Sequence, residues 1–233
     1  MQTVVAMITR SEDLKIAPSL LAADFSRLAE EIQCIEDAGA DLLHLDVMDG
    51  HFVPNLALSS GLIKSLRPLT QLPFDVHLML THPQEHIPAF VEAGADRITV
   101  HLEVNSTPIF ALIDRIKSHG VEVGLALCPP TEIETVSPFL SQVDLVLPMS
   151  VNPGFSGQSF QLPALEKMDW LKQKIERDNL SVTIQADGGV NADTVAAVVA
   201  NGATVLVAGS AIFKSDDYRA AIQELRLGYS PRG

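Results

Sequence analysis

The chain of 233 residues is strongly acidic, with 29 Asp and Glu against 16 Lys and Arg and a formal net charge of −13. Its 47% of hydrophobic residues suffices for a sizeable core and excludes a disordered chain, a collagen-like chain and a disulfide scaffold. The negative charge argues against a nucleic acid or an anionic membrane as partner, and no apolar run approaches the ~18 residues of a membrane span. A local anion site built from backbone N–H groups is still compatible with this charge.

The cysteines and the chain ends give no sign of secretion. Cys34 and Cys128 lie far apart and form no C-x-x-C pair, so neither a disulfide framework nor a thiolate metal site is expected. Cys34 lies in an amphipathic helical stretch and is expected in the core. Residues 1–14 hold a short apolar patch (4–8) without a basic leader or a clear cleavage site, which predicts an N-terminal extension rather than a signal peptide. We expect a short tail over 229–233 and a cytoplasmic location.

Short β-rich runs alternate with helical stretches along the chain. A strand from Lys15 precedes a helix predicted over Phe25–Ala38, with Asp24 as its N-cap. A last helix is predicted over Asp216–Arg226. Further strands are expected to begin near Asp41, Leu72, Arg97, Val121, Val143, Val182 and Thr204.

A repeated phrase marks the step from helix to strand. It reads Ala-Gly-Ala-Asp or a near variant and contains Gly39, Gly94 and Gly202. Each glycine stands just past a helix end, where a left-handed residue is needed, and a buried strand follows. Eight strand–helix units without a linker predict a single-domain α/β fold, a (β/α)8 TIM barrel over residues 15–228. A doubly wound open sheet is the alternative, but segment 18–21 lacks the glycine-rich fingerprint typical of it.

Strand ends carry a set of residues that suits a metal ion, and in this fold the chemistry lies at the carboxyl ends of the strands. Side chains alternate along a strand, so His44 and Asp46 share one face of the second strand, and Asp75 and His77 share one face of the third. Asp187 precedes a Gly-Gly pair and reaches the same mouth from the seventh strand. A lone H-x-D is more often a hydrogen-bonded strand end, but its recurrence on neighbouring strands predicts a divalent metal site.

Glycine-containing loops follow the last strands, where barrel enzymes frequently bind phosphate. Gly188 and Gly189 follow the seventh strand, and Gly209 and Ser210 follow the eighth. Glycines let backbone N–H groups approach an anion closely, so these loops predict a phosphate site. The loop over 153–158 is expected to close over it.

Other strand-end residues border the same mouth. Ser19 ends the first strand and is expected to contact the substrate. Met48, Met79 and Met149 stand beside charged groups and predict an apolar lining for the reacting centre rather than plain core filling. His101 also ends a strand, and we expect it to support the ligands or the structure.

These residues belong to motifs that are specific to one enzyme family. The motifs are Pro18–Phe25, His44–Gly50, Phe52–Asn55, Asp75–Met79, Met149–Phe155, Gly157–Phe160 and Asp187–Val190. Through them the chain resembles the ribulose-phosphate 3-epimerases from Ile16 to Phe213. The resemblance implies a (β/α)8 fold, one divalent metal ion (Zn, Fe, Mn or Co), a phosphorylated ketose substrate and a homo-oligomer.

The resemblance also implies the roles of individual residues. It makes His44, Asp46, His77 and Asp187 the metal ligands, with His77 also at the substrate. It makes Asp46 and Asp187 the acid/base pair that interconverts D-ribulose 5-phosphate and D-xylulose 5-phosphate by inverting C3 through an enediolate, in the pentose phosphate pathway or the Calvin cycle. The residues that it places around the phosphate are Gly154, Gly157, Gly188, Gly189, Gly209 and Ser210.

Departures from the family pattern leave alternatives open. Ser59 stands where the pentulose enzymes usually have Gly and where allulose-6-phosphate 3-epimerases tend to have Ser. Gln185 replaces a common Glu, and Cys128 stands in place of the Asn of a usual Asn-Pro pair. A phosphosugar lyase or decarboxylase is expected to carry a lysine at a strand end, and none is found there. A phosphoribosylanthranilate-type isomerase requires a cysteine where Ser19 stands, and a non-enzymatic barrel has no need of the acids.

Overall fold

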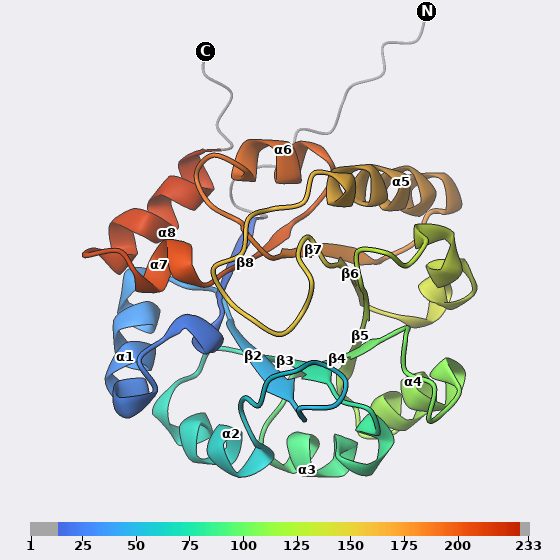
Figure 1. Cartoon of the computed structure of the whole chain (residues 1–233), viewed down its shortest axis with the longest axis horizontal. Helices are drawn as coiled ribbons and strands as arrows, with labels where there is room; N and C mark the ends of the chain where they lie inside the picture. The colour runs from blue at the N-terminus through green and yellow to red at the C-terminus, as the bar shows by residue number, and fades with distance from the viewer. Residues whose placement is uncertain (1–13, 229–233) are drawn as a thin grey trace, which may run out of the picture.

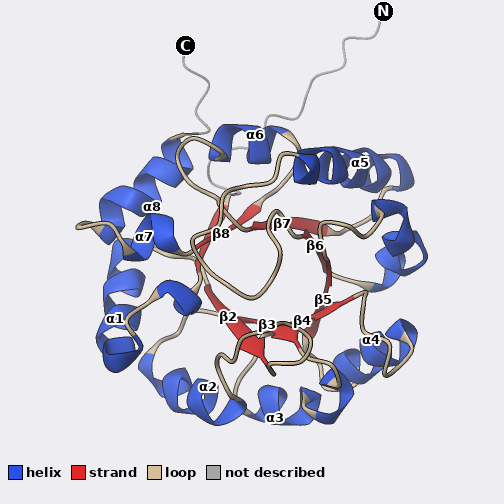
Figure 2. Ribbon diagram, in the orientation of Figure 1, coloured by secondary structure: helices blue, strands red, loops and turns tan. Residues whose placement is uncertain are grey.

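Eight parallel strands form a nearly closed barrel in the computed structural model, which describes residues 14–228. The strands are β1 (Lys15–Pro18), β2 (Leu43–Met48), β3 (Phe74–Met79), β4 (Arg97–His101), β5 (Glu122–Leu127), β6 (Leu145–Pro148), β7 (Thr183–Asp187) and β8 (Val205–Ala208). They pair in the order β1-β8-β7-β6-β5-β4-β3-β2, and Figure 2 shows the ring that they make. A parallel bridge of Ser19 with His44 joins β1 to β2. The predicted (β/α)8 barrel is therefore confirmed.

Helices surround the barrel on all sides (Figure 1). The α-helices are α1 (Leu28–Ala38), α2 (Ser60–Leu66), α3 (Ile87–Glu92), α4 (Ile109–Lys117), α5 (Pro163–Asp178), α6 (Val195–Ala200), α7 (Ser210–Phe213) and α8 (Tyr218–Leu227). The 3-10 segments are η2 (Leu20–Ala22), η3 (Phe25–Arg27), η4 (Arg67–Leu69), η5 (Pro83–Glu85) and η6 (Ile133–Gln142). Every strand begins within two residues of the position predicted from the sequence.

The first helical region shows one confirmed expectation and one error. Asp24 is the N-cap, and its Oδ1 accepts from the backbone N–H of Ser26 at 2.9 Å. The first turn is 3-10, and α1 begins only at Leu28. Cys34 is exposed and not in the core, because the helical period directs Ile32 and Ile35 at the barrel and turns residue 34 outward.

The predicted helix-to-strand glycines adopt the left-handed conformation. Their φ angles are 91° at Gly39, 95° at Gly94 and 100° at Gly202. A side chain is strained at such angles, so glycine ends each helix at little cost and directs the chain into the next strand.

Aspartates hydrogen-bond neighbouring strands at the amino-terminal end of the barrel. In each case, a carboxylate just before one strand accepts a hydrogen bond from a backbone N–H at the start of the preceding strand. The pairs are Asp41 with Ile16 at 2.7 Å, Asp96 with Phe74 at 2.7 Å and Asp144 with Val123 at 2.8 Å. The aspartate of the repeated phrase, at Asp41 and Asp96, therefore ties neighbouring strands together, and Asp144 does the same outside the phrase.

Removing one of these ties is expected to destabilise the protein without changing its chemistry. In Asp41→Ala, the N–H of the fully buried Ile16 loses its acceptor, and Arg226 loses the carboxylate with which it pairs. We expect the free energy of unfolding to fall by about 1–3 kcal/mol. Urea unfolding measures this change, with Glu30→Ala, at an exposed acid of α1, as the control. An unchanged unfolding midpoint contradicts the assigned role.

The barrel interior is apolar near β6 and β8 and polar near β2, β3 and β4. Leu145, Leu147, Val205 and Val207 are all buried. His44, Asp46, Asp75, His77 and His101 are buried on the other side. Buried polar groups need partners, so this half of the interior is the place to look for chemistry.

The predicted chain ends fall mostly outside the described residues. Leu14, the last residue of the expected extension, is buried in the core. Residues 1–13, with the apolar patch at 4–8, and the tail 229–233 lie outside the described part of the chain. None of the helices within residues 14–228 has the length and apolar character to cross a membrane.

Candidate active site

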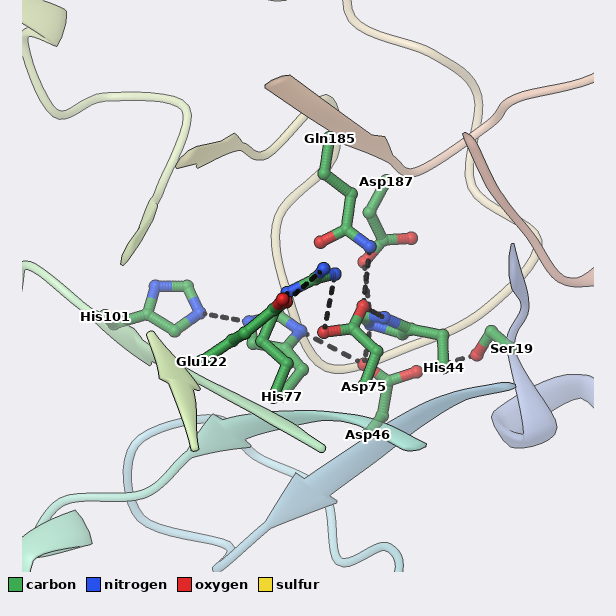
Figure 3. Close-up of polar contacts among 10 residues, drawn as sticks. Ser19, His44, Asp46, Asp75, His77, His101, Glu122, Gln185 and Asp187 are labelled. Carbon is green, nitrogen blue, oxygen red and sulfur yellow. Dashed lines mark hydrogen bonds and ion pairs between the residues drawn. The ribbon is translucent and has the colours of Figure 1, made fainter. Parts of the chain in front are cut away.

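Three strands bring the predicted metal ligands together at the mouth of the barrel (Figure 3). Asp46 of β2 lies opposite His77 of β3 in the strand register, and Asp187 ends β7. One ligand atom from each of His44, Asp46, His77 and Asp187 lies within 4.8 Å of the others. The alternation of side chains read from the sequence therefore holds: the H-x-D segment of β2 and the D-x-H segment of β3 both direct their polar residues inward.

Asp46 lies at the centre of this group. Its Oδ2 accepts from Ser19 Oγ at 2.7 Å, and its Oδ1 lies 3.2 Å from His77 Nδ1. His44 Nε2 lies 3.3 Å from the same Oδ1 and 3.8 Å from Asp187 Oδ2. This nitrogen is buried and makes no hydrogen bond with any described residue. An unpartnered imidazole nitrogen that faces two carboxylates is a suitable ligand for a cation.

The orientation of His44 is fixed from below by Asp75. Asp75 Oδ2 lies 2.9 Å from His44 Nδ1 and accepts from Gln185 Nε2 at 2.6 Å. Burial alone raises the pKa of Asp75, but the bond to His44 and the charge of Arg97 hold it at about 2. A charged carboxylate only accepts, so His44 Nδ1 carries a proton and Nε2 turns to the centre. Burial lowers the pKa of His44, but Asp46 and Asp75 together hold it well above the usual value of an imidazole. The sequence placed Asp75 on the correct face and noted Gln185 as unusual, but it predicted neither the contact of Asp75 with His44 nor that of Gln185 with Asp75.

The two carboxylates of the centre differ strongly in acidity. Burial raises the pKa of Asp187 to about 7, and the charges of Asp46 and Asp75 add to this while His44 opposes it. Asp46 is also buried, but His44 and His77 hold its pKa well below the usual value of a carboxyl. In the metal-free site, one carboxylate is therefore charged near neutral pH while the other binds a proton readily.

His101 lies behind His77, which agrees with the supporting role expected of it. Its Nε2 is 2.9 Å from His77 Nε2, and the two rings stack with centroids 4.9 Å apart. Its Nδ1 lies 3.1 Å from Glu103 Oε2. Burial lowers the pKa of His101 to about 4, so the ring is neutral.

A cavity of about 370 Å³ opens above the polar group. Asp46 and Asp187 lie in its wall, whereas His44 and His77 are fully buried beneath it. The other predicted site residues in its lining are Ser19, Met48, Met79, Met149, Gly154, Gly157, Gly188, Gly189, Gly209 and Ser210. The structure thus places the predicted apolar residues and the predicted glycine-containing loops around the same cavity. Lys214 also borders it and was not expected from the sequence.

Close packing of two loops positions Asp187. Ser150 Oγ donates to the backbone oxygen of Asp187 at 2.6 Å, which holds the end of β7 against β6. Gly189 has φ 68°, and a Cβ there meets Phe160 N at only 2.4 Å. Glycine is required at this point because a side chain pushes the β6–α5 loop away from the mouth. Asn55 Nδ2 donates to Gly154 O at 2.7 Å and ties the same loop to the segment after β2.

Two departures from the family pattern have structural explanations outside the cavity. Ser59 is the N-cap of α2, where its Oγ accepts from Leu62 N at 3.3 Å, and its side chain is exposed. Cys128 follows β5 and lies 3.6 Å from His101 Nδ1. Neither residue lines the cavity above Asp46.

Solved structures of other barrel enzymes share the fold. The structure of KGPDC from Streptococcus mutans aligns with a TM-score of 0.70 at 12% identity, covering 93% of this chain and 97% of the other. A 3-hexulose-6-phosphate synthase aligns with a TM-score of 0.65 at 21% identity, covering 93% and 100%. Likeness at such low identity shows the barrel architecture alone.

Relatives with closer sequences identify the family. The chain is 44% identical to the ribulose-phosphate 3-epimerase of Bacillus subtilis (strain 168), over 91% of this chain and 98% of the relative. It is 42% identical to the chloroplastic ribulose-5-phosphate-3-epimerase of Arabidopsis thaliana, over 94% and 78%. The model of the ribulose-phosphate 3 epimerase family matches residues 15–213. The chain therefore belongs to the ribulose-phosphate 3 epimerase family.

Proposed function

We propose that the protein, an epimerase by its family, inverts C3 of D-ribulose 5-phosphate to give D-xylulose 5-phosphate. The observation that carries this proposal is the meeting of Asp46 and Asp187 in the wall of one cavity, with His44 and His77 directly beneath. Inversion at carbon requires a proton carrier on each face of the sugar, and two carboxylates from different strands supply two carriers.

The residues present fit a divalent metal ion. Two imidazoles and two carboxylates converge, and His44 Nε2 is buried there without a partner among the described residues. Such a mixed nitrogen and oxygen set suits Zn²⁺, Fe²⁺, Mn²⁺ or Co²⁺. We assign His44, Asp46, His77 and Asp187 as the ligands. A bound ion supplies Lewis-acid stabilisation of the negative charge that develops on the sugar oxygens when the C3 proton leaves.

The two acids exchange roles with the direction of the reaction. The carboxylate that starts charged removes the C3 proton, and the carboxyl that starts protonated delivers a proton to the opposite face of the enediolate. Without a metal ion, burial raises the pKa of Asp187, whereas His44 and His77 outweigh burial and lower the pKa of Asp46, so the two carboxyl groups differ in their affinity for a proton. Ser19 Oγ donates to Asp46 Oδ2 and keeps that carboxylate oriented. The methionines 48, 79 and 149 line the hollow and exclude water from the reacting carbon.

The phosphate binds at the glycine-containing end of the cavity in this proposal. Gly154, Gly157, Gly188, Gly189, Gly209 and Ser210 all border the hollow. Lys214 borders the same region and adds a positive charge. The β6–α5 loop lies over the mouth (Figure 1), in a position to cover a bound sugar phosphate.

A substrate without the phosphate is expected to react poorly. Binding energy from the phosphate orients the distant C3 atom, so its loss lowers kcat as well as raising KM. We expect kcat/KM for free D-ribulose to be at least ~100-fold below that for D-ribulose 5-phosphate, about 3 kcal/mol of transition-state stabilisation. Measuring both sugars with the same enzyme preparation tests this. Equal efficiency on both contradicts the assigned phosphate site.

Allulose 6-phosphate is the alternative substrate. Ser59, which matches the pattern of the hexulose enzymes, is exposed at the start of α2 and does not line the cavity. The test compares turnover of ribulose 5-phosphate and allulose 6-phosphate after reconstitution with Zn²⁺, Fe²⁺, Mn²⁺ or Co²⁺ in separate samples. Preference for the pentulose with every active metal supports the proposal, and preference for the hexulose overturns it.

We also propose a cytoplasmic location and a homo-oligomeric assembly. Both cysteines of the described residues are free, which agrees with the reducing cytoplasm. The homo-oligomer implied by the family resemblance stays a prediction, and light scattering on the purified protein tests it.

A further inference from the structure

A line of buried polar groups runs away from the proposed metal site, behind His77. His77 Nε2 lies 2.9 Å from His101 Nε2, and His101 Nδ1 lies 3.1 Å from Glu103 Oε2. His77 and His101 are both fully buried, and the side chain of Glu103 is 25% exposed. The line therefore connects the centre of the barrel to a carboxylate near its rim. The reaction proposed above gives no role to His101 or Glu103.

The hydrogen bonds of Glu103, at the outer end of this line, determine which nitrogen of each imidazole carries a proton. The backbone N–H of Cys128 donates to Glu103 Oε1 at 2.7 Å, and Thr131 Oγ1 donates to the same oxygen. The other oxygen, Oε2, faces His101 Nδ1. A carboxylate only accepts, so the proton of neutral His101 sits on Nδ1 and the lone pair sits on Nε2. That lone pair must accept a hydrogen bond from His77 Nε2, which places a proton there.

A proton on His77 Nε2 determines the role of the other ring nitrogen, Nδ1. A proton on Nε2 leaves Nδ1 as the nitrogen of His77 that can bind a cation, and Nδ1 lies 3.2 Å from Asp46 Oδ1. Two electron-rich atoms at this distance are stabilised by a shared cation. We propose that Glu103 and His101 are positioning residues that set the tautomer of His77, so that Nδ1 and not Nε2 is the nitrogen that binds the metal ion. This inference rests on the metal site proposed above.

His44, the other histidine of the site, is oriented by direct contact with a carboxylate. Asp75 lies directly on His44 Nδ1 at 2.9 Å, so His44 faces the centre with Nε2. The two imidazoles therefore bind the metal ion through different nitrogens in this proposal. Asp75 contacts His44 directly and sets its tautomer, whereas Glu103 sets the tautomer of His77 through His101. Partners that fix the tautomer of a ligating histidine also raise its basicity, and their loss typically weakens metal binding 10–100-fold.

The variant Glu103→Gln tests the proposal because it reverses the polarity of the line without changing its shape. The backbone N–H of Cys128 can only donate, so the amide oxygen of the new side chain must take the place of Oε1. The amide NH2 then faces His101 Nδ1 and donates to it, which moves the proton of His101 to Nε2. Two N–H groups now oppose each other between His101 and His77, and His77 can no longer keep its proton on Nε2.

Two measurements on the full-length protein test whether Glu103→Gln changes the Zn²⁺ affinity and the histidine tautomers. The dissociation constant for Zn²⁺, from competition with a chromophoric chelator, is expected to rise about 10–100-fold in Glu103→Gln. Nitrogen-15 NMR of histidine-labelled, Zn²⁺-loaded wild type is expected to show His77 with a proton on Nε2 and His101 with a proton on Nδ1. The His101 proton is expected on Nε2 in Glu103→Gln. A purely structural role for Glu103 moves neither the tautomer nor the affinity.

Cys128→Ala is the matched control, since it removes the thiol 3.6 Å from His101 Nδ1 and keeps the backbone donor to Glu103. We expect wild-type Zn²⁺ affinity and unchanged tautomers. A protonated Nε2 on wild-type His101, or wild-type Zn²⁺ affinity in Glu103→Gln, overturns the inference and leaves the metal site standing. Wild-type protein that binds no Zn²⁺ through His44 and His77 overturns the proposed metal site, and this inference with it.

Discussion

Replacing Asp187 by Asn is expected to slow epimerisation at C3 by orders of magnitude while the protein stays folded. The amide matches the carboxyl in shape, but it neither accepts nor delivers a proton, so one face of the sugar loses its carrier. Removal of a general acid or base typically lowers the rate 10²- to 10⁴-fold, and we expect a fall in kcat within that range. Conversion of ribulose 5-phosphate followed by NMR measures it.

The metal content of this variant must be measured beside its activity, because Asp187 is also a proposed ligand. Asp193→Asn, which makes the same change at an exposed position after β7, is the control and is expected to keep full activity. We expect one of the two pentulose phosphates to retain slow exchange of its C3 proton through Asp46, which identifies the face that each acid serves. An Asp187→Asn enzyme that keeps its metal and the parent rate contradicts the two-carrier mechanism.

Loss of His44 is expected to remove both the metal ion and the activity. His44 Nε2 is fully buried, faces Asp46 and Asp187, and has its other nitrogen fixed by Asp75. Loss of a residue that only supports a ligand weakens metal binding by about 10–100-fold, so His44→Ala, which deletes a ligand, is expected to exceed ~100-fold. Elemental analysis after dialysis and Zn²⁺ competition measure the loss.

The same result is expected for His77→Ala, because His77 Nδ1 and His44 Nε2 both lie close to Asp46 Oδ1. His119→Ala is the matched control, since His119 is exposed at the end of α4. It is expected to bind metal and turn over substrate as the parent does. Full metal occupancy with normal turnover in both His44→Ala and His77→Ala rules out the assigned ligands.

The barrel could be predicted from the sequence because its signals are local. A left-handed glycine after a helix and an aspartate before a strand each depend on only a few neighbouring residues, and they recur along the chain at Gly39 and Asp41 and again at Gly94 and Asp96. Cys34 was misplaced because a cysteine suits either face of an amphipathic helix, and only the position of Ile32 and Ile35 against the barrel decides its orientation.

The sequence predicted only those parts of the candidate site that follow from the alternation of side chains along a strand. Alternation places His44 and Asp46 on one face, and the parallel register then brings His77 beside Asp46. The contact of Gln185 with Asp75 joins residues 110 positions apart, and the stagger of the closed barrel sets it. The stacking of His101 on His77 depends in addition on side-chain rotamers, which no spacing in the sequence encodes.

Proton exchange at C3 tests the central proposal most directly. Ribulose 5-phosphate is converted by the metal-loaded enzyme in deuterated water, and the xylulose 5-phosphate formed is analysed by NMR. Removal of the C3 proton by one carboxylate and delivery of a solvent-derived proton by the other predict deuterium at C3 of the product. Xylulose 5-phosphate that forms at the normal rate with its original hydrogen at C3 contradicts the assignment of Asp46 and Asp187 as two separate proton carriers.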